Sequence, residues 1–367
     1  MKTLRYLFGV FFLFVYCSML EAAFWGSFGS GYSSDDNFYK DVFGYNNTGY
    51  YYTFNLNAKS ALSRDFSYDA FYILLGRKNY KITWEDNFVN NAGMSFTARP
   101  SDILSVRFSG SFENRTFRDE FSVKYNYNQY TAGMEVPLYI LDYTTPKVGL
   151  SYENIKYNNF SYDSTAIGPL LELQQELSPW SIMTLSAKAM ARNYPTQNLY
   201  EDVTTTTTVK RRDIELQSGI ILSTIINRDW NFSAGIRYSD VRSNANLSVV
   251  DTSVEGSSRT LVADYYSFAG PSLFFETVFY PARKLGCVLG GTYQKKSYPG
   301  RYATDSAGQM PGETRKDERF IVSAGVTYRM LRFITLKAEY SYEKSSSNDY
   351  IYNYSNNIFS TGINVAF

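Results

Sequence analysis

Charged side chains recur along this sequence between apolar neighbours. Lys337 and Glu339, for example, are two residues apart and flank Ala338. Residues two apart on a β-strand point to the same face, so charges of both signs would share one face and apolar side chains the other. A charged face can attract or repel ions and polar solutes, and this chemistry breaks no covalent bond. The residues that we assign to such a pore lining are Arg107, Lys124, Lys188, Glu215, Arg237, Lys337 and Glu339.

The sequence offers few residues for acid–base catalysis or metal binding. The chain contains no histidine, which is the commonest general base. It has no glycine-rich phosphate loop and no Cys/His metal spacing, so we expect no enzymatic activity, cofactor or bound metal. An enzyme that relies on lysine or carboxylate groups ranks last among the functions considered. Residues 32–37 (YSSDDN) could offer oxygen ligands to calcium, but Asp and Asn are also common in turns.

Apolar and polar residues alternate in many segments. In residues 334–343 (ITLKAEYSYE), apolar or aromatic side chains take one parity and mainly polar or charged side chains the other. Aromatic residues make up 18% of the chain, yet its mean hydropathy is only −0.30. Strands with one face in lipid and the other in water explain both values, whereas a soluble β-sandwich would expose a large apolar area. Similar alternation occurs in residues 50–59, 104–113, 183–189, 230–238, 322–328 and 359–367.

Turn signals divide the sequence into strands. Short signals recur at 63–66, 99–102, 142–146, 178–180, 227–230, 280–284 and 329–333. Longer, more polar connections are expected at 35–47, 84–88, 115–120, 158–165, 195–209, 244–259, 299–317 and 344–350. This pattern predicts an all-β fold, a transmembrane antiparallel β-barrel of about 16 strands, within a range of 14 to 18, with both termini in the periplasm. The segments 195–209 and 299–317 are candidates for a loop that constricts the lumen.

The N-terminus carries an export signal. Lys2 and Arg5 precede an apolar run, and small residues follow it at Ala22 and Ala23. We therefore expect a signal peptide at residues 1–22 and a barrel domain at residues 23–367. Basic and acidic residues balance at 36 and 35, so nucleic acid is not expected as a partner. Export together with a barrel pattern places the protein in the outer membrane of a Gram-negative-type cell.

The last residues continue the alternation to the end of the sequence. Ile363, Val365 and Phe367 share one parity, and an outward aromatic there would let the last strand pair with residues 24–32. The segment 358–367 (IFSTGINVAF) resembles the C-terminal signal that the barrel-assembly machinery recognises in outer-membrane proteins. That resemblance implies an assembly role for Ile363, Val365 and Phe367.

The wider C-terminal segment resembles the β-barrel porin type 2 family and similar barrels that accompany exopolysaccharide systems. The matching pieces are Asp317, AEYSY at 338–342, Ser347 with Asn348, Tyr354 and Asn357. The resemblance covers roughly the last fifty residues in detail. It implies an integral outer-membrane protein and brings no catalytic residues.

These patterns predict a porin-like channel for passive diffusion of small hydrophilic solutes through a mixed-charge lumen. The same charges would equally suit a salt-bridged interior that fills the barrel. The alternatives are a channel or accessory for exopolysaccharide export, and a plugged barrel with a structural or adhesive role. The expected partners are outer-membrane lipid and lipopolysaccharide, the barrel-assembly machinery, and small polar solutes or polysaccharide. Oligomeric state does not follow from the sequence.

Overall fold

The structure is a computed structural model of the chain. It describes residues 23–37, 40, 44, 46–118, 125–158, 162–200, 206–245, 247–251, 258–262, 265–306 and 312–367. The expected signal peptide at residues 1–22 and the predicted lining residue Lys124 therefore lie outside the described residues.

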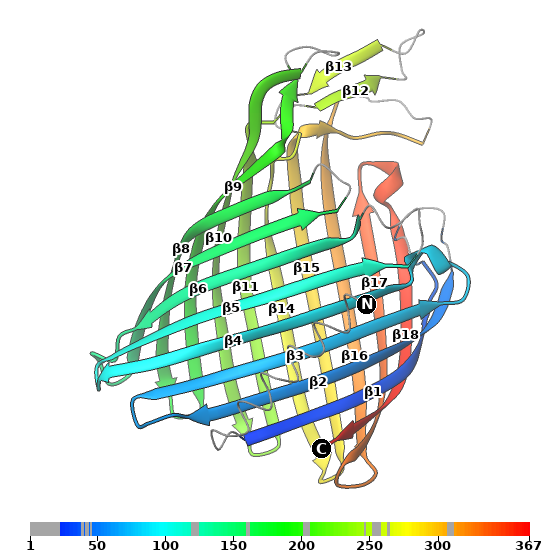
Figure 1. Cartoon of the computed structure of the whole chain (residues 1–367). Coiled ribbons are helices and arrows are strands. Elements are labelled where there is room, and N and C mark those ends of the chain that lie inside the picture. The colour runs from blue at the N-terminus through cyan, green and yellow to red at the C-terminus, as the bar shows by residue number, and fades with distance from the viewer. Residues whose placement is uncertain are drawn as a thin grey trace.

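Sixteen antiparallel strands of the described chain close into one barrel (Figure 1). Their predicted number and class are confirmed. The barrel strands are β1 (Ala23–Asp35), β2 (Asn47–Ala61), β3 (Phe66–Asn79), β4 (Asn87–Ser101), β5 (Leu104–Phe117), β6 (Tyr127–Pro137), β7 (Thr144–Tyr157), β8 (Ser164–Ser178), β9 (Ser181–Tyr200), β10 (Thr206–Asn227), β11 (Trp230–Ser243), β14 (Phe268–Ala282), β15 (Leu285–Tyr302), β16 (Thr314–Arg329), β17 (Ile334–Ser347) and β18 (Tyr354–Ala366).

Four further elements of the described chain connect barrel strands. The hairpin of β12 (Leu247–Asp251) and β13 (Ser258–Val262) forms a separate two-stranded sheet. Short 3-10 turns occur at η1 (Thr83–Glu85) and η3 (Tyr350–Tyr352). None of the helices in the described ranges has the length and apolar composition needed to span a bilayer.

The barrel closes where β1 pairs with β18. The register runs from Ser27 opposite Ala366 to Asp35 opposite Ile358, and it overlaps the predicted pairing partner, residues 24–32, from Ser27 to Tyr32. On the inner wall, the Tyr51 hydroxyl donates a hydrogen bond to the Thr361 carbonyl at 3.3 Å, reaching from β2 across β1 to β18. Pairing of the first and last strands leaves no open edge, which hydrocarbon would penalise.

Alternation along the strands produces the two faces that the sequence predicted. Phe108, Leu171 and Ile220 occupy one face and are 51%, 55% and 47% exposed in the isolated chain. Their strand neighbours Arg107, Glu172 and Gly219 occupy the other face, because successive side chains point to opposite sides. In a closed barrel the apolar face lies outside and the charged face lines the lumen.

All short connections lie at one end of the barrel, and β1 begins and β18 ends there (Figure 1). Several predicted boundaries were wrong by a few residues. The turn predicted at 142–146 lies instead between Pro137 and Thr144, and the turn predicted at 99–102 lies between Ser101 and Leu104.

The long connections gather at the opposite end. Residues predicted as the loop 195–209 largely extend β9 to Tyr200 and begin β10 at Thr206. These two strands rise beyond their neighbours, and the β12–β13 hairpin lies near their tip (Figure 1). The hairpin occupies the segment predicted as the loop 244–259 and extends past it.

Candidate functional site

The six predicted lining residues within the described ranges all fall on the charged inner face. Each faces a neighbour on the adjacent strand that shares the same side of the sheet. The opposite residues are Glu135 for Arg107, Gln217 for Lys188, Met190 for Glu215, Gly219 for Arg237, Gly362 for Lys337 and Ser360 for Glu339. The geometry places these side chains on the lumen wall, and their role in selecting solutes stays a prediction.

Arg192 of β9 is the centre of the largest ionic group on the middle of the wall. Its Nη1 atom donates to Glu153 Oε1 and its Nε atom to Glu215 Oε1, both at 2.5 Å. Glu153 lies on β7 and Glu215 on β10, so the guanidinium on β9 joins carboxylates from two other strands. Gln129 of β6 donates to the second oxygen of Glu153 at 3.0 Å. Because the guanidinium offers a planar set of five donors, it suits a shared position between two carboxylates.

A hollow in the inner wall adjoins this group. Its volume is about 380 Å³, and polar side chains from β5 to β10 form most of its lining. Lys188 and Gln217 lie on one side, and Ser109, Thr131 and Ser151 contribute hydroxyl groups on the other. The described residues include no carboxylate within 4.0 Å of the Lys188 ammonium group.

Other charges nearer the short turns are paired with neighbours. Lys147 Nζ lies 2.9 Å from Glu172 and 3.9 Å from Glu135. Lys337 Nζ lies 2.6 Å from Glu339 Oε1, and both side chains remain about half exposed. Positively and negatively charged groups thus occur at the same height along the barrel. Their pairing leaves the carboxylate and ammonium groups in contact with the lumen.

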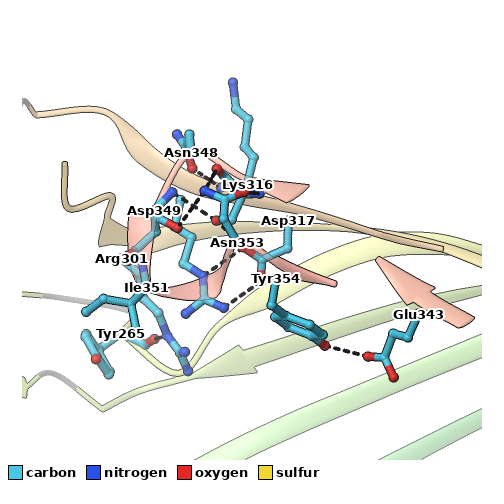
Figure 2. Close-up of polar contacts among 12 residues, drawn as sticks. Tyr265, Arg301, Lys316, Asp317, Glu343, Asn348, Asp349, Ile351, Asn353 and Tyr354 are labelled. Atoms are coloured by element: carbon cyan, nitrogen blue, oxygen red, sulfur yellow. Dashed lines mark hydrogen bonds and ion pairs between the residues drawn. The ribbon is translucent and has the colours of Figure 1, made fainter. Parts of the chain in front are cut away.

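At the loop end, Glu343 of β17 collects three donors. Lys40 Nζ lies 2.6 Å from its Oε2 atom, and Arg319 Nε lies 2.5 Å from its Oε1 atom. The Tyr354 hydroxyl also donates to Oε1, as Figure 2 shows. The Glu343 side chain is only 3% exposed, so this buried carboxylate depends on its three partners.

Arginine side chains stack on aromatic rings at the same end. The Arg211 guanidinium lies between Tyr194 and Tyr266, 4.1 and 3.6 Å from the two ring centroids, and it also pairs with Asp213. In the connection before β14, burial raises the pKa of the Tyr266 hydroxyl. Stacking and pairing together hold Arg211 in one position.

A second stack lies near η3. The Arg315 guanidinium is 3.3 Å from the Tyr352 ring centroid and 4.7 Å from that of Tyr298, and it pairs with Asp317. Asp349 precedes η3, accepts a hydrogen bond from the Ile351 amide, and has its pKa raised by burial. Sequence reasoning missed Arg192, Arg211 and Arg315 as organising residues. The carboxylate partners of Arg192 lie on other strands, and the aromatic rings around Arg211 and Arg315 come from segments distant in the sequence.

The outer surface shows where lipid meets the protein. Phe320, Val322, Ala324, Val326 and Tyr328 form an outward apolar row on β16. Beyond Phe320, toward the loops, the outward Glu318 pairs with Lys295 of β15 at 3.0 Å. Aromatic side chains near the short turns complete the other border of the belt. These are Phe66, Tyr143, Trp180, Trp230, Tyr280 and Phe333, all exposed in the isolated chain.

The C-terminal strands also match a known family model. Residues 297–367 match the family described as Putative beta-barrel porin 2. This match agrees with the resemblance drawn from the C-terminal sequence. The whole chain forms a closed barrel with an apolar outer face, as outer-membrane barrels do. This chain is an outer-membrane β-barrel.

The chain is also similar to several solved structures. The trimer form of OmpT from Vibrio cholerae has 11% identity and a TM-score of 0.49, with 94% of this chain and 99% of that chain covered. A bacterial polysaccharide outer membrane secretin has 9% identity and a TM-score of 0.48, with 93% and 98% covered. OccD3 (OpdP) of Pseudomonas aeruginosa has 10% identity and a TM-score of 0.47, with 95% and 91% covered. No curated protein matches the sequence.

The outer-membrane β-barrel lies in the outer membrane of a Gram-negative cell. Its apolar belt contacts the lipid and lipopolysaccharide of that membrane, since these are the molecules that replace water around the outward side chains. Its inner wall carries cations and carboxylates in mutual contact, with a polar hollow at mid-height.

Proposed function

We propose that this outer-membrane β-barrel is a porin-like channel for passive diffusion of small hydrophilic solutes. The observation that carries the proposal is the mixed-charge inner wall. If side chains packed the interior of the barrel as a hydrophobic core, the inner face would be apolar. Instead, Lys188, Glu215 and Lys337 share the inner face with hydroxyl and amide groups. Sixteen strands enclose a lumen wide enough for water. The channel performs no covalent chemistry under this proposal.

The orientation and assembly of the channel belong to the same proposal. We infer that both termini face the periplasm, because short turns face that side in bacterial outer-membrane barrels. The barrel-assembly machinery would then recognise the outward side chains on the last strand, which are Ile363, Val365 and Phe367. The signal peptide at residues 1–22 would direct export before that step.

A second candidate is export of a polysaccharide through the same lumen. The stacked rings at the loop end favour it, since Tyr194, Tyr266, Tyr298 and Tyr352 place aromatic faces close to one mouth of the barrel. Aromatic faces suit the apolar faces of sugar rings. Small-solute diffusion remains the main proposal because the arginines already occupy these rings.

Single-channel recording in planar bilayers tests the main proposal. The purified barrel should give steady open currents, and Lys337→Glu should shift the ion preference toward cations, because a second carboxylate would then stand beside Glu339. The substitution changes the charge by two units, and each unit charge about 4 Å away is worth about 1 kcal/mol in water, or roughly fivefold in the permeability ratio.

Lys295→Glu is the matched control. Lys295 and Lys337 are each 47% exposed and each pairs with a glutamate, but Lys295 points outward. The control should therefore leave the ion preference near that of the unchanged protein. Absence of conductance in the unchanged protein would contradict the channel and favour a plugged structural barrel.

A further inference from the structure

The wall between β8 and β9 contains an interrupted ladder. Strand pairing runs from Thr165 opposite Asn193 to Ile167 opposite Ala191, and it resumes only at Leu170 opposite Lys188. The residues between are Gly168 and Pro169. Proline has no N–H to donate and is rare within a central strand. Between the interruption and the loop end of the described strands, three residue pairs join β8 and β9, and Arg192 of β9 also donates to Ser164 of β8 and to Glu153 of β7.

The backbone geometry explains why glycine precedes the proline. A Cβ atom built on Gly168 would lie 1.7 Å from the Ala189 carbonyl oxygen. In a regular ladder the Ala189 carbonyl would accept a hydrogen bond from the backbone N–H of the opposite residue on β8. That residue is Pro169, which has no N–H. Gly168 thus allows close approach of the two strands at the point where the ladder bond is missing.

Two hollows lie back to back at this interruption. The polar hollow of about 380 Å³ faces the lumen, and a second hollow of about 370 Å³ is lined mainly by outward residues. Pro169, Leu171, Ala189 and Leu216 contribute apolar side chains to the outer hollow. Lys188 and Gln217 contribute to both hollows, so only the thickness of the sheet separates the two.

The charges on the inner side indicate which molecule fits. Arg192 is engaged by Glu153 and Glu215, whereas the Lys188 ammonium has no carboxylate within 4.0 Å in the described part of the chain. An anionic group would complement Lys188 in the inner hollow. An alkyl chain would fit the apolar outer hollow, because it would lose water contact there.

We propose that the β8–β9 seam above Gly168 and Pro169 is a lateral passage by which a single-chain anionic amphiphile moves its head between the lumen and the surrounding lipid. The head contacts Lys188 while the tail lies in the outer hollow. Opening requires the three pairs from Thr165 to Ile167 to separate and the bonds of Arg192 to Ser164 and Glu153 to break, while the ladder below Leu170 stays intact. This passage is independent of diffusion along the barrel axis.

A similar interruption occurs on the other side of the same strand group. Pairing of β14 with β15 includes Ala269 opposite Ser297 and resumes at Ser272 opposite Gln294, so it skips Gly270 and Pro271. A Cβ atom on Gly270 would lie 1.8 Å from the Lys295 carbonyl oxygen. Strands β9, β10, β11 and β14 are therefore bounded on both sides by ladders with a Gly-Pro interruption.

A reversible lock tests the passage. In a Cys287→Ser background, Ile167→Cys with Ala191→Cys introduces an opposed pair above the interruption, and Leu173→Cys with Leu185→Cys introduces a matched pair below it. The probe is a long-chain alkyl sulfonate with a photoreactive group beside its head, already incorporated in the bilayer of proteoliposomes. Mass spectrometry then measures labelling of the peptide that contains Lys188.

We expect labelling in the unlocked protein and in the protein locked below the interruption. Oxidising the upper pair should abolish it, and reduction should restore it. Equal labelling with the upper seam locked, or no labelling in any protein, would overturn the proposal. The experiment does not depend on conductance, so its failure is distinct from failure of the proposed channel.

A single substitution provides a second test without a disulfide. Pro169→Val supplies the missing N–H and should strengthen the seam, so Lys188 labelling should fall. Pro146→Val is the control, because Pro146 lies on β7 where pairing with Leu173 is continuous. Undiminished labelling in Pro169→Val, with native-like barrel mobility on electrophoresis, would contradict the proposed role of the interruption.

Discussion

Gly26 and Phe367 are joined by two reciprocal backbone hydrogen bonds. The Gly26 amide donates to the Phe367 carbonyl at 2.9 Å, and the Phe367 amide donates to the Gly26 carbonyl at 3.0 Å. The Phe367 ring covers the outer side of Gly26 and stacks on Phe54 with centroids 6.3 Å apart. The last residue therefore fastens β18 to β1 and reaches across to β2 at the short-turn end.

Removal of the Phe367 ring should weaken barrel closure. Phe367→Ala keeps both backbone bonds but loses the cover over Gly26 and the stack on Phe54, a contact of roughly 1 kcal/mol beyond its buried area. The midpoint of unfolding, followed by heat-dependent electrophoretic mobility, should fall. Phe359→Ala is a suitable control, because Phe359 is an outward residue in the middle of the same strand. A larger loss in the control would contradict the closing role.

Glu343→Ala should destabilise the loop end of the barrel. The change removes a carboxylate that Lys40, Arg319 and Tyr354 share, and it leaves two cations without their partner. Breaking a fully buried pair costs about 3 to 5 kcal/mol, but both cations are more than one-third exposed, so we expect roughly 1 to 3 kcal/mol. Denaturant unfolding in liposomes measures this difference.

Glu318→Ala is the matched control for Glu343→Ala. Glu318 also pairs with a cation at the loop end, but its side chain is 48% exposed and points outward. Exposed pairs contribute about 0 to 1 kcal/mol, so this variant should unfold close to the unchanged protein. If both variants lost the same free energy of unfolding, the three donors around Glu343 would contribute nothing extra to stability.

Arg192→Met should make the lumen prefer cations more strongly. The substitution keeps a long side chain but leaves Glu153 and Glu215 without their shared guanidinium. Loss of one positive charge should raise the cation-to-anion permeability ratio severalfold, as measured by reversal potentials in a salt gradient. Arg192→Lys keeps the charge and should restore most of the original ratio. An unchanged ratio in Arg192→Met would mean that ions do not pass this group.

Much of the barrel was predictable because the information is local. The two-residue period assigned Arg107, Lys188 and Lys337 to the inner face without knowledge of which strands are neighbours. Turn residues likewise gave the number of strands. Boundaries were less accurate where polar residues continue a strand, as in β9 and β10, since the same residue types also occur in loops.

The ionic groups could not be predicted in the same way. The contacts of Arg192 depend on the register of β7, β9 and β10, and that register is set by pairing over distances that alternation does not encode. The contact of Lys40 with Glu343 joins residues 303 positions apart. The approach of Gly168 to the Ala189 carbonyl likewise depends on strand pairing that alternation does not encode.

Gly31→Ala should disturb closure from the inner side. A Cβ atom there would lie 2.2 Å from the Thr361 carbonyl oxygen and 2.4 Å from the Tyr51 hydroxyl, whose ring lies over Gly31 and reaches Gly362. The ring can rotate away, but the carbonyl belongs to the backbone of β18, so the β1–β18 seam must shift. Gly110→Ala is the control, because its new Cβ atom would meet only the Thr131 carbonyl oxygen at an ordinary 3.6 Å. We expect Gly31→Ala to lower the unfolding midpoint and Gly110→Ala to leave it unchanged or raised, since alanine restricts the unfolded chain. A neutral Gly31→Ala would mean that Tyr51 and its seam adapt without cost.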